Sequence, residues 1–201
     1  GVNVIAEGVD EFALQTKLLS QRVELYCEDL QWSEKTASEQ KALNQWKSTM
    51  LAFHYIEAFP VGPLSDNRNW LHTQIYSWPY IDTCGIDLEV IRYSRSGVPN
   101  KKIVYNQKGL AALEYLLFEP KLSSQCNPRA YPQTAKWSEK SIWEKKRDRC
   151  HFAQVLAKDL VDKSQNLLAA WSPEQGNFSK TLIDGSKFKS IKEATNALTD
   201  T

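Results

Sequence analysis

The stretch SIWEKKRDRCHFAQVLAKDLVDKSQNLLAAW, residues Ser141 to Trp171, decides the fold class of this protein. Apolar side chains recur in it at three- and four-residue steps, the spacing that places them on one face of an α-helix. The stripe consists of Ile142, Phe152, Val155, Leu156, Leu160, Val161, Leu167 and Leu168. Because Pro173 cannot continue a helix, the pattern predicts one long helix that ends near Trp171.

Two more helices with the same periodicity precede this one. The first is predicted over residues 10–30 and the second over residues 38–59. The stripe of the second helix consists of Leu43, Trp46, Met50, Phe53 and Ile56. Pro60 ends it, because the residue before a proline is biased out of helical backbone. A further helix is expected to begin at residues 191–198.

Residues 61–105 break this periodicity. Pro and Gly punctuate the segment, so we expect short helices and ordered loop, with one short helix near residues 86–93. The segment also contains four aromatic residues, Trp70, Tyr76, Trp78 and Tyr80. Aromatic side chains this dense indicate a connection that packs onto the helices or lines a cleft.

The most apolar segment is GLAALEYLLFE, residues 109–119. A helix that is apolar nearly all round is typically buried. Glu114 lies in its middle, and a carboxylate in such surroundings must lose its water unless it meets a partner. We therefore expect Glu114 to be a buried functional or paired group. Gly109 lies in the first turn, where the missing side chain lets another backbone come close.

Together these segments predict an all-α protein, an up-and-down helical bundle with a long, ordered, aromatic-rich connection. Residues 1–201 are then a single helical domain. Apolar residues make up 42% of the chain, and 25 Lys and Arg stand against 24 Asp and Glu. This balance argues against a nucleic-acid-binding protein, which would need a concentrated basic surface.

The sequence contains no run of about 18 apolar residues, so we expect no transmembrane segment. No signal peptide is visible at Gly1-Val2-Asn3. We expect any export signal to have been removed, and a lipid anchor upstream of Gly1 is compatible with this start.

Four cysteines, Cys27, Cys84, Cys126 and Cys150, include no C-x-x-C pair. A four-cysteine zinc site is therefore not expected, which leaves two disulfides or four buried thiols. We favour disulfides, which would place the protein in an oxidising compartment. We predict Cys126–Cys150, because Cys126 opens an irregular segment and Cys150 lies on the helix that follows. Cys27–Cys84 then remains by elimination.

His54 and Glu57 are three residues apart on the second predicted helix and so lie on one face. Such a pair can supply two ligands to a metal held in a helical bundle. The simpler alternative is a half-exposed pair joined by a hydrogen bond. His72 and His151 are expected on the surface or at helix caps.

Three segments together resemble the imelysin-like family. They are QWKSTMLAFHYIEAFPVGP at residues 45–63, SWPY at residues 77–80, and GLAALEYLLFE at residues 109–119. The family pattern places a Glu eleven residues after a Trp and then Gly-Pro, and Trp46, Glu57 and Gly62-Pro63 fall in register. Its most distinctive segment, Gly-x-His-x-x-Glu, falls on Gly109 and Glu114. The resemblance extends from about residue 40 to residue 171.

The resemblance implies an all-helical, extracytoplasmic protein of the bacterial envelope, either periplasmic or an outer-membrane-associated lipoprotein. The family is associated with iron uptake and is named for a reported peptidase activity. Its members usually have two related bundles, of which this chain would cover the first and the start of the second. The family site would gather Glu57 with the His and Glu of the motif.

The chain departs from this pattern at the motif histidine, where it has Ala111. A methyl group can neither ligate a metal nor transfer a proton. A metallopeptidase needs about three ligands and a base for its water. Glu57 and Glu114 do not supply that set, even if His54 substitutes for the missing histidine.

We therefore expect an extracytoplasmic binding protein. It would hold a metal ion such as iron or zinc, a metal chelate or an envelope protein partner near Glu57 and Glu114, with His54, Trp78 and Gly109 beside them. This hypothesis predicts a cleft that is roofed by Trp70, Trp78 and Tyr80. The alternatives are a metal-dependent peptidase of the imelysin type and a structural bundle whose glutamates only pair within the core.

Overall fold

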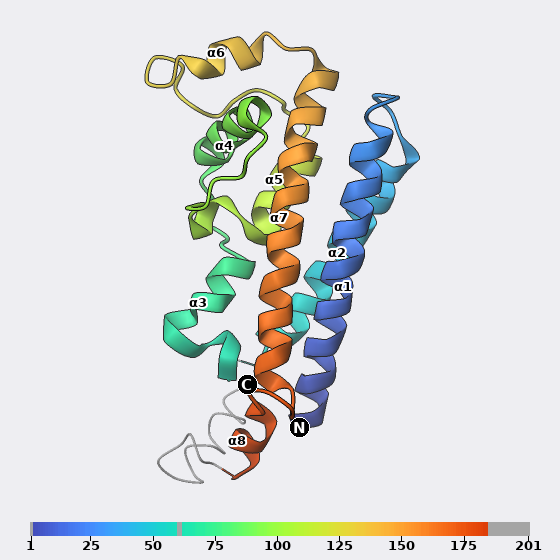
Figure 1. Ribbon diagram of the computed structural model, residues 1–201, viewed down its shortest axis with the longest axis vertical. Coiled ribbons are helices and arrows are strands. Elements are labelled where there is room, and N and C mark those ends of the chain that lie inside the picture. Colours follow the sequence, from blue (N-terminus) through green and yellow to red (C-terminus); the bar gives the residue numbers. More distant parts are fainter. Residues whose placement is uncertain (1, 60–61, 185–201) are drawn as a thin grey trace.

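The computed structural model describes residues 2–59 and 62–184, and all regular structure in these residues is helical (Figure 1). Three long helices run along the molecule: α1 (Val2–Asp29), α2 (Ala37–Glu57) and α7 (Ile142–Trp171). Helix α2 returns antiparallel to α1, and α7 also runs antiparallel to α1 (Figure 1). The predicted all-α, up-and-down bundle is confirmed.

The core of the bundle lies where α1 packs against both α7 and α2. Phe12 and Val23 of α1 and Leu156 of α7 are almost completely buried there. Burial of one such side chain contributes roughly 1.5–3 kcal/mol to folding. The same interface includes one polar contact, 2.7 Å between the hydroxyl oxygens of Thr16 and Ser164, which gives both buried groups a partner.

Helix α7 has the bounds that its sequence predicts. The hydroxyl of Ser141 accepts a hydrogen bond from the backbone N–H of Glu144, and the Glu144 carboxylate accepts one from the Ser141 N–H. This capping box satisfies two N–H groups that the first turn would otherwise leave unpaired. The helix ends at Trp171, immediately before Ser172-Pro173.

The described part of the connection between α2 and α5 combines short helices with loops, as predicted. It contains the short helix η1 (Gly62–Leu64), α3 (Asp66–Ile75), α4 (Thr83–Ser96) and the short helix η2 (Tyr105–Gln107). Three residues of α3 with left-handed backbone, 67–69, interrupt it. Helix α4 extends beyond the predicted residues 86–93, and the Trp78–Pro79 peptide bond between α3 and α4 is cis.

Helix α5 (Gly109–Phe118) lies inside the molecule, where it packs on α7 and also contacts α2, α3 and α4. Trp46 of α2 donates a hydrogen bond from Nε1 to the carbonyl of Leu110 at 2.9 Å. Gly109 has a φ of 77°, and a Cβ there would lie 2.4 Å from the carbonyl oxygen of Ile75. The prediction that Gly109 lets another backbone approach is therefore confirmed. Two short helices, α6 (Gln133–Ser138) and α8 (Phe178–Asp184), complete the described fold.

The cysteines form two disulfides, but the predicted pairing is wrong. Cys27 pairs with Cys150 and Cys84 pairs with Cys126, with Cα–Cα distances of 5.5 and 4.7 Å. Because α1 and α7 are antiparallel, the end of α1 lies beside the start of α7 and brings Cys27 to Cys150. The prediction joined cysteines that are close along the chain, whereas the packing of helices far apart in sequence decides the pairing.

None of the helices in residues 2–59 and 62–184 is long and apolar enough to cross a membrane. The helix expected over residues 191–198 lies outside the described residues.

Candidate functional site

A cleft of about 470 Å³ opens between α5 and the connection from α3 to α4. We call it the α5 cleft. Helix α5 and its end contribute Ala111, Glu114, Tyr115, Phe118 and Glu119 to its wall, and the connection and the start of α4 contribute Tyr76, Trp78, Ile81 and Thr83. The cleft is therefore lined by four aromatic rings and two carboxylates, and none of the described residues in its lining is Lys, Arg or His.

Glu114 is exposed at the α5 cleft, and the expectation of a fully buried carboxylate is wrong. The neighbours of Glu114 along α5 are buried, but its own position faces the opening rather than α7. It forms no hydrogen bond or ion pair with the described residues. Partial burial beside the aromatic residues nevertheless raises the pKa of Glu114 above its usual value. The result is a carboxylate without a protein partner at the edge of an aromatic cleft.

Glu57 and His54 form the expected pair at the end of α2. A second histidine, His72, also contacts Glu57, so the three side chains form a histidine–glutamate cluster. The Glu57 carboxylate contacts His54 Nδ1 at 2.8 Å through one oxygen and His72 Nε2 at 2.5 Å through the other. Burial alone would raise the pKa of Glu57, but the hydrogen bonds from His72 and His54 outweigh it and the pKa is lowered. Glu57 is therefore an anion with both oxygens engaged.

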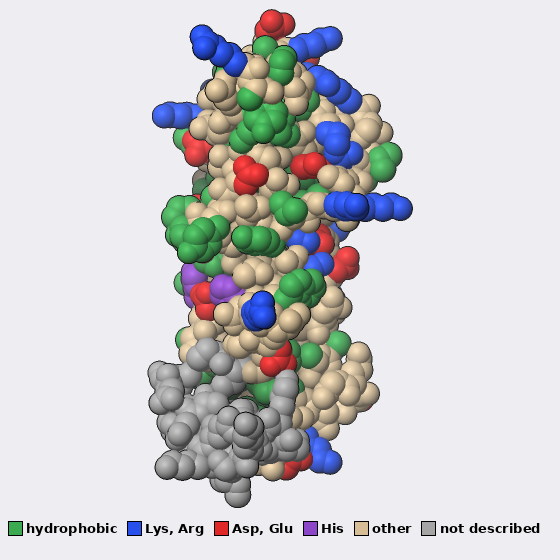
Figure 2. Space-filling model, turned by 90° about the vertical axis from the view of Figure 1, so that its left-hand side faces the viewer, with side chains coloured by type: hydrophobic (Ala, Val, Ile, Leu, Met, Phe, Trp, Pro, Cys, Tyr) green, Lys and Arg blue, Asp and Glu red, His purple; other side chains and the backbone are tan. Residues whose placement is uncertain are grey.

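Tyr76 connects this cluster to the α5 cleft. Its ring lies 5.9 Å from the ring of His54, and its side chain lines the cleft. Burial and then the negative charges of Glu114 and Glu57 raise the pKa of Tyr76. Figure 2 shows this side of the molecule, where hydrophobic side chains (green) gather just above two adjoining histidines (purple). Tyr76 thus places the histidine–glutamate cluster next to the α5 cleft.

The expected residues are therefore only partly brought together. Trp78 and Glu114 line the α5 cleft, whereas Glu57 and His54 lie beside it and Gly109 supports the first turn of α5 against Ile75. Trp70 and Tyr80, the other expected parts of the roof, are exposed but do not line the cleft.

Sequence reasoning missed His72, which it placed on the surface or at a cap. His72 lies on α3, a short helix of the irregular connection, and no pattern within that segment indicates that it meets Glu57 of α2. His151 is half-buried on α7 and contacts Gln31 at 3.1 Å, far from this cluster in the fold. Its burial, together with the positive charge of Arg147, lowers the pKa of His151.

The donor set of the site does not form a metal centre by itself. Within residues 2–59 and 62–184, no three His, Cys, Asp or Glu side chains converge so that they could hold a metal ion. The reason is visible at Glu57, whose two oxygens each face a different histidine instead of sharing one point with them.

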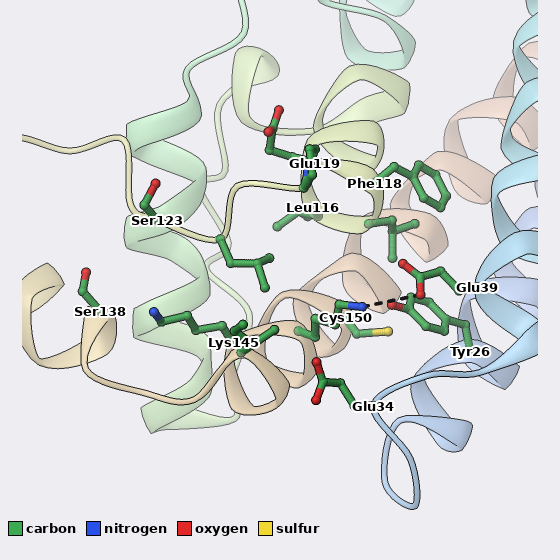
Figure 3. A pocket seen from close by; sticks show the side chains of 15 residues that line it. Tyr26, Glu34, Glu39, Leu116, Phe118, Glu119, Ser123, Ser138, Lys145 and Cys150 are labelled. Carbon is green, nitrogen blue, oxygen red and sulfur yellow. Dashed lines mark ion pairs between the residues drawn. The ribbon is translucent and has the colours of Figure 1, made fainter.

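A second, larger cleft of about 630 Å³ lies on the other side of the α5 end. Figure 3 shows Tyr26 and Glu39 on the α1 and α2 side of this cleft and Phe118 at the end of α5, whereas the Glu119 side chain points away from them. Lys146 of α7 pairs with Glu39 at 3.5 Å across this cleft. Phe118 and Glu119 line both clefts, so the two adjoin at the end of α5.

A model of the imelysin family of peptidases matches residues 8–201 of the chain. The chain belongs to the imelysin family. Searches among curated proteins and among solved structures find no match. In this imelysin-family chain, the motif positions Ala111 and Glu114 face the same cleft, one helical turn apart on α5.

Membership in the imelysin family and the two disulfides both indicate a compartment outside the cytoplasm. Disulfides form and persist in oxidising environments outside the cytoplasm. Both bridges of this imelysin-family chain join elements that are distant in sequence, with separations of 123 and 42 residues. The chain is therefore an extracytoplasmic protein.

Proposed function

We propose that this chain is an extracytoplasmic binding protein of the imelysin family that takes a ligand into the α5 cleft. The observation that carries the proposal is Glu114, an unpaired carboxylate at the mouth of a cleft walled by aromatic rings. A volume of about 470 Å³ is that of a small-molecule site. The aromatic rings and the carboxylate of the cleft suit a ligand that has an apolar face and a group that can bind to a carboxylate.

A metal chelate is the ligand that the family's association with iron uptake favours. A chelate brings its own donor atoms, so it does not need three converging protein ligands. Glu114 would bind its polar edge and Trp78 would cover its apolar face. Glu57, with His54 and His72, would hold the neighbouring Tyr76 in place. The protein would then act in the periplasm or on an outer-membrane-associated anchor.

Binding is better supported than peptide hydrolysis, and the reason lies on α5. A metal-dependent peptidase positions a metal through side chains that converge on it and activates a water beside it. Here the motif position one turn before Glu114 carries the methyl group of Ala111, and both Glu57 oxygens are engaged by histidines. These groups can recognise a ligand, but they lack the donor set for hydrolysis.

Isothermal titration calorimetry of the metal-stripped protein tests the proposal. The titrants are Fe(II), Zn(II), the uncharged ferric chelate ferrichrome and the anionic chelate ferric citrate. We expect a chelate to bind more tightly than either bare ion, because the cleft supplies contacts but few ligands. Glu114→Gln should weaken that binding about tenfold or more, the loss of one charge-assisted hydrogen bond.

Two further variants make the result specific. Glu24→Gln removes a carboxylate from the exposed face of α1, far from the cleft, and should bind as the wild type does. Glu57→Gln should weaken binding less than Glu114→Gln, since Glu57 acts through Tyr76. If no metal or chelate binds while all variants remain folded by circular dichroism, the chelate form of the proposal is wrong.

A further inference from the structure

The buried side of α5 already holds a guanidinium group in a defined environment. Arg149 of α7 is completely buried, and its guanidinium carbon lies 4.7 Å from the centre of the Tyr115 ring. Its Nη2 lies 3.3 Å from the carboxylate of Asp87 on α4. An aromatic ring and a carboxylate together therefore hold a cation on one side of α5.

The α5 cleft repeats this combination on the open side of the helix, without the cation. Glu114 supplies a carboxylate that no described residue pairs, and Glu119 supplies a second one. Trp78 stands over the cleft with 61% of its surface exposed, and Tyr76 and Phe118 add two more rings. Indole is the aromatic ring that attracts a cation most strongly.

The charge distribution of the cleft also favours a cationic ligand. Its described lining contains two carboxylates and no basic side chain. Concave surfaces that carry charge of one sign concentrate ligands of the opposite sign. Partial burial, which raises the pKa of Glu114, removes part of its water, so a cation that pairs with it meets less competition from solvent.

We propose that the α5 cleft recognises an organic cation, a guanidinium or alkylammonium group stacked on Trp78 and paired with Glu114. This inference rests on the proposed binding function and names, besides the metal chelate, a second class of ligand that the same cleft suits. The cation could belong to a small molecule or to an arginine or lysine side chain of a protein segment. Both sources share one chemistry, a charged head on an apolar stem, which fits carboxylates at the mouth and rings along the walls.

Calorimetric titration with N-acetyl-L-arginine amide tests the charge. N-acetyl-L-citrulline amide is the matched ligand, because it has nearly the same shape and no charge. We expect the arginine derivative to bind at least about tenfold more tightly than the citrulline derivative. The peptide Ac-Gly-Gly-Arg-Gly-Gly-amide separates the two sources. Tighter binding of the peptide than of the small amide indicates a protein segment, and equal binding indicates a free cation.

Variants test the two groups that the proposal names. Glu114→Gln should lower the affinity for the arginine derivative about tenfold or more, while Glu24→Gln on the exposed face of α1 should leave it unchanged. Trp78→Leu should also weaken binding. Trp78→Phe should retain part of it, because a smaller ring still offers a π face. If Trp78 had only a structural role, the affinity for the arginine derivative would not depend on whether the replacement at residue 78 is aromatic.

The outcomes separate this inference from the proposed function. Equal affinity for the arginine and citrulline derivatives, or no effect of Glu114→Gln, overturns the cation proposal. If a ferric chelate binds through Glu114 and no organic cation does, the cation proposal fails and the binding function stands. If neither class of ligand binds to the folded protein, both fail.

Discussion

Glu57 shows at the scale of a single residue how this site is organised. Two histidines from different helices engage its two oxygens, so the residue that the family motif singles out supports the site rather than lying open in it. Glu114, the one charged side chain within α5, is left to face the cleft. The same residue type therefore has two roles, and the partners that surround each one decide which.

Gly109 carries a prediction at this scale, and Gly97 provides its control. Both have left-handed backbone, with φ of 77° and 64°, but a Cβ at Gly97 would meet nothing within 4 Å. Gly97→Ala should therefore cost only the backbone penalty, about 1 kcal/mol. Gly109→Ala adds a clash with the Ile75 carbonyl and should lower the free energy of unfolding by about 3 kcal/mol. Equal losses in denaturant titrations of the two variants would show that the close approach to Ile75 does not matter.

At the scale of elements, Asp87 joins three helices and a loop. Its carboxylate accepts hydrogen bonds from Tyr115 on α5, from Arg149 on α7 and from the backbone N–H of Gln125. Asp87 and Arg149 are both almost completely buried. The network thereby holds α4, α5 and α7 together directly behind the α5 cleft.

Removal of one charge from this network should be costly. Asp87→Asn leaves the Arg149 guanidinium buried without its counter-charge and should lower the free energy of unfolding by about 3–5 kcal/mol. Addition of Arg149→Met should recover part of that loss, because the unpaired charge is then gone. Chemical denaturation of the wild type, the two single variants Asp87→Asn and Arg149→Met, and the double variant measures the coupling. A double variant no more stable than Asp87→Asn would contradict the ion-pair explanation.

At the scale of the whole molecule, the disulfides join distant parts of the chain. Cys27–Cys150 links the end of α1 to the start of α7, and Cys84–Cys126 links α4 to the segment before α6. The loops that they close span 123 and 42 residues. In an oxidising compartment these bridges stabilise the folded state chiefly because they restrict the unfolded chain.

The two bridges should differ measurably in their contributions. Paired serine replacement of Cys27 and Cys150 should cost about 5 kcal/mol, and that of Cys84 and Cys126 about 4 kcal/mol, since the longer loop loses more entropy on closure. Guanidinium denaturation with and without reductant provides the measurement, and peptide mapping without reductant identifies the pairs. A denaturation midpoint that reductant leaves unchanged would contradict this role of the disulfides.

Local patterns were sufficient to predict the three long helices, the apolar character of α5 and the close backbone approach at Gly109, although α1 begins at Val2 and not near residue 10. Periodicity and capping act within a few residues, and Ser141, Pro173 and the stripe of α7 are read directly from the chain. Trp78, Glu114 and the pair of His54 and Glu57 were likewise chosen from the sequence. Trp78 and Glu114 line one cleft and His54 contacts Glu57, while the role of these residues in binding stays a prediction.

The tertiary structure decided which side of α5 faces solvent, which histidine reaches Glu57 and which cysteines pair. Glu114 is exposed because α7 covers the other side of α5, and no pattern within residues 109–119 contains that information. His72 reaches Glu57 because the connection folds α3 back against α2, and Cys27 meets Cys150 because α1 and α7 are antiparallel. Each of these depends on contacts between segments far apart in the chain, whereas helical periodicity is set by neighbours three and four residues apart.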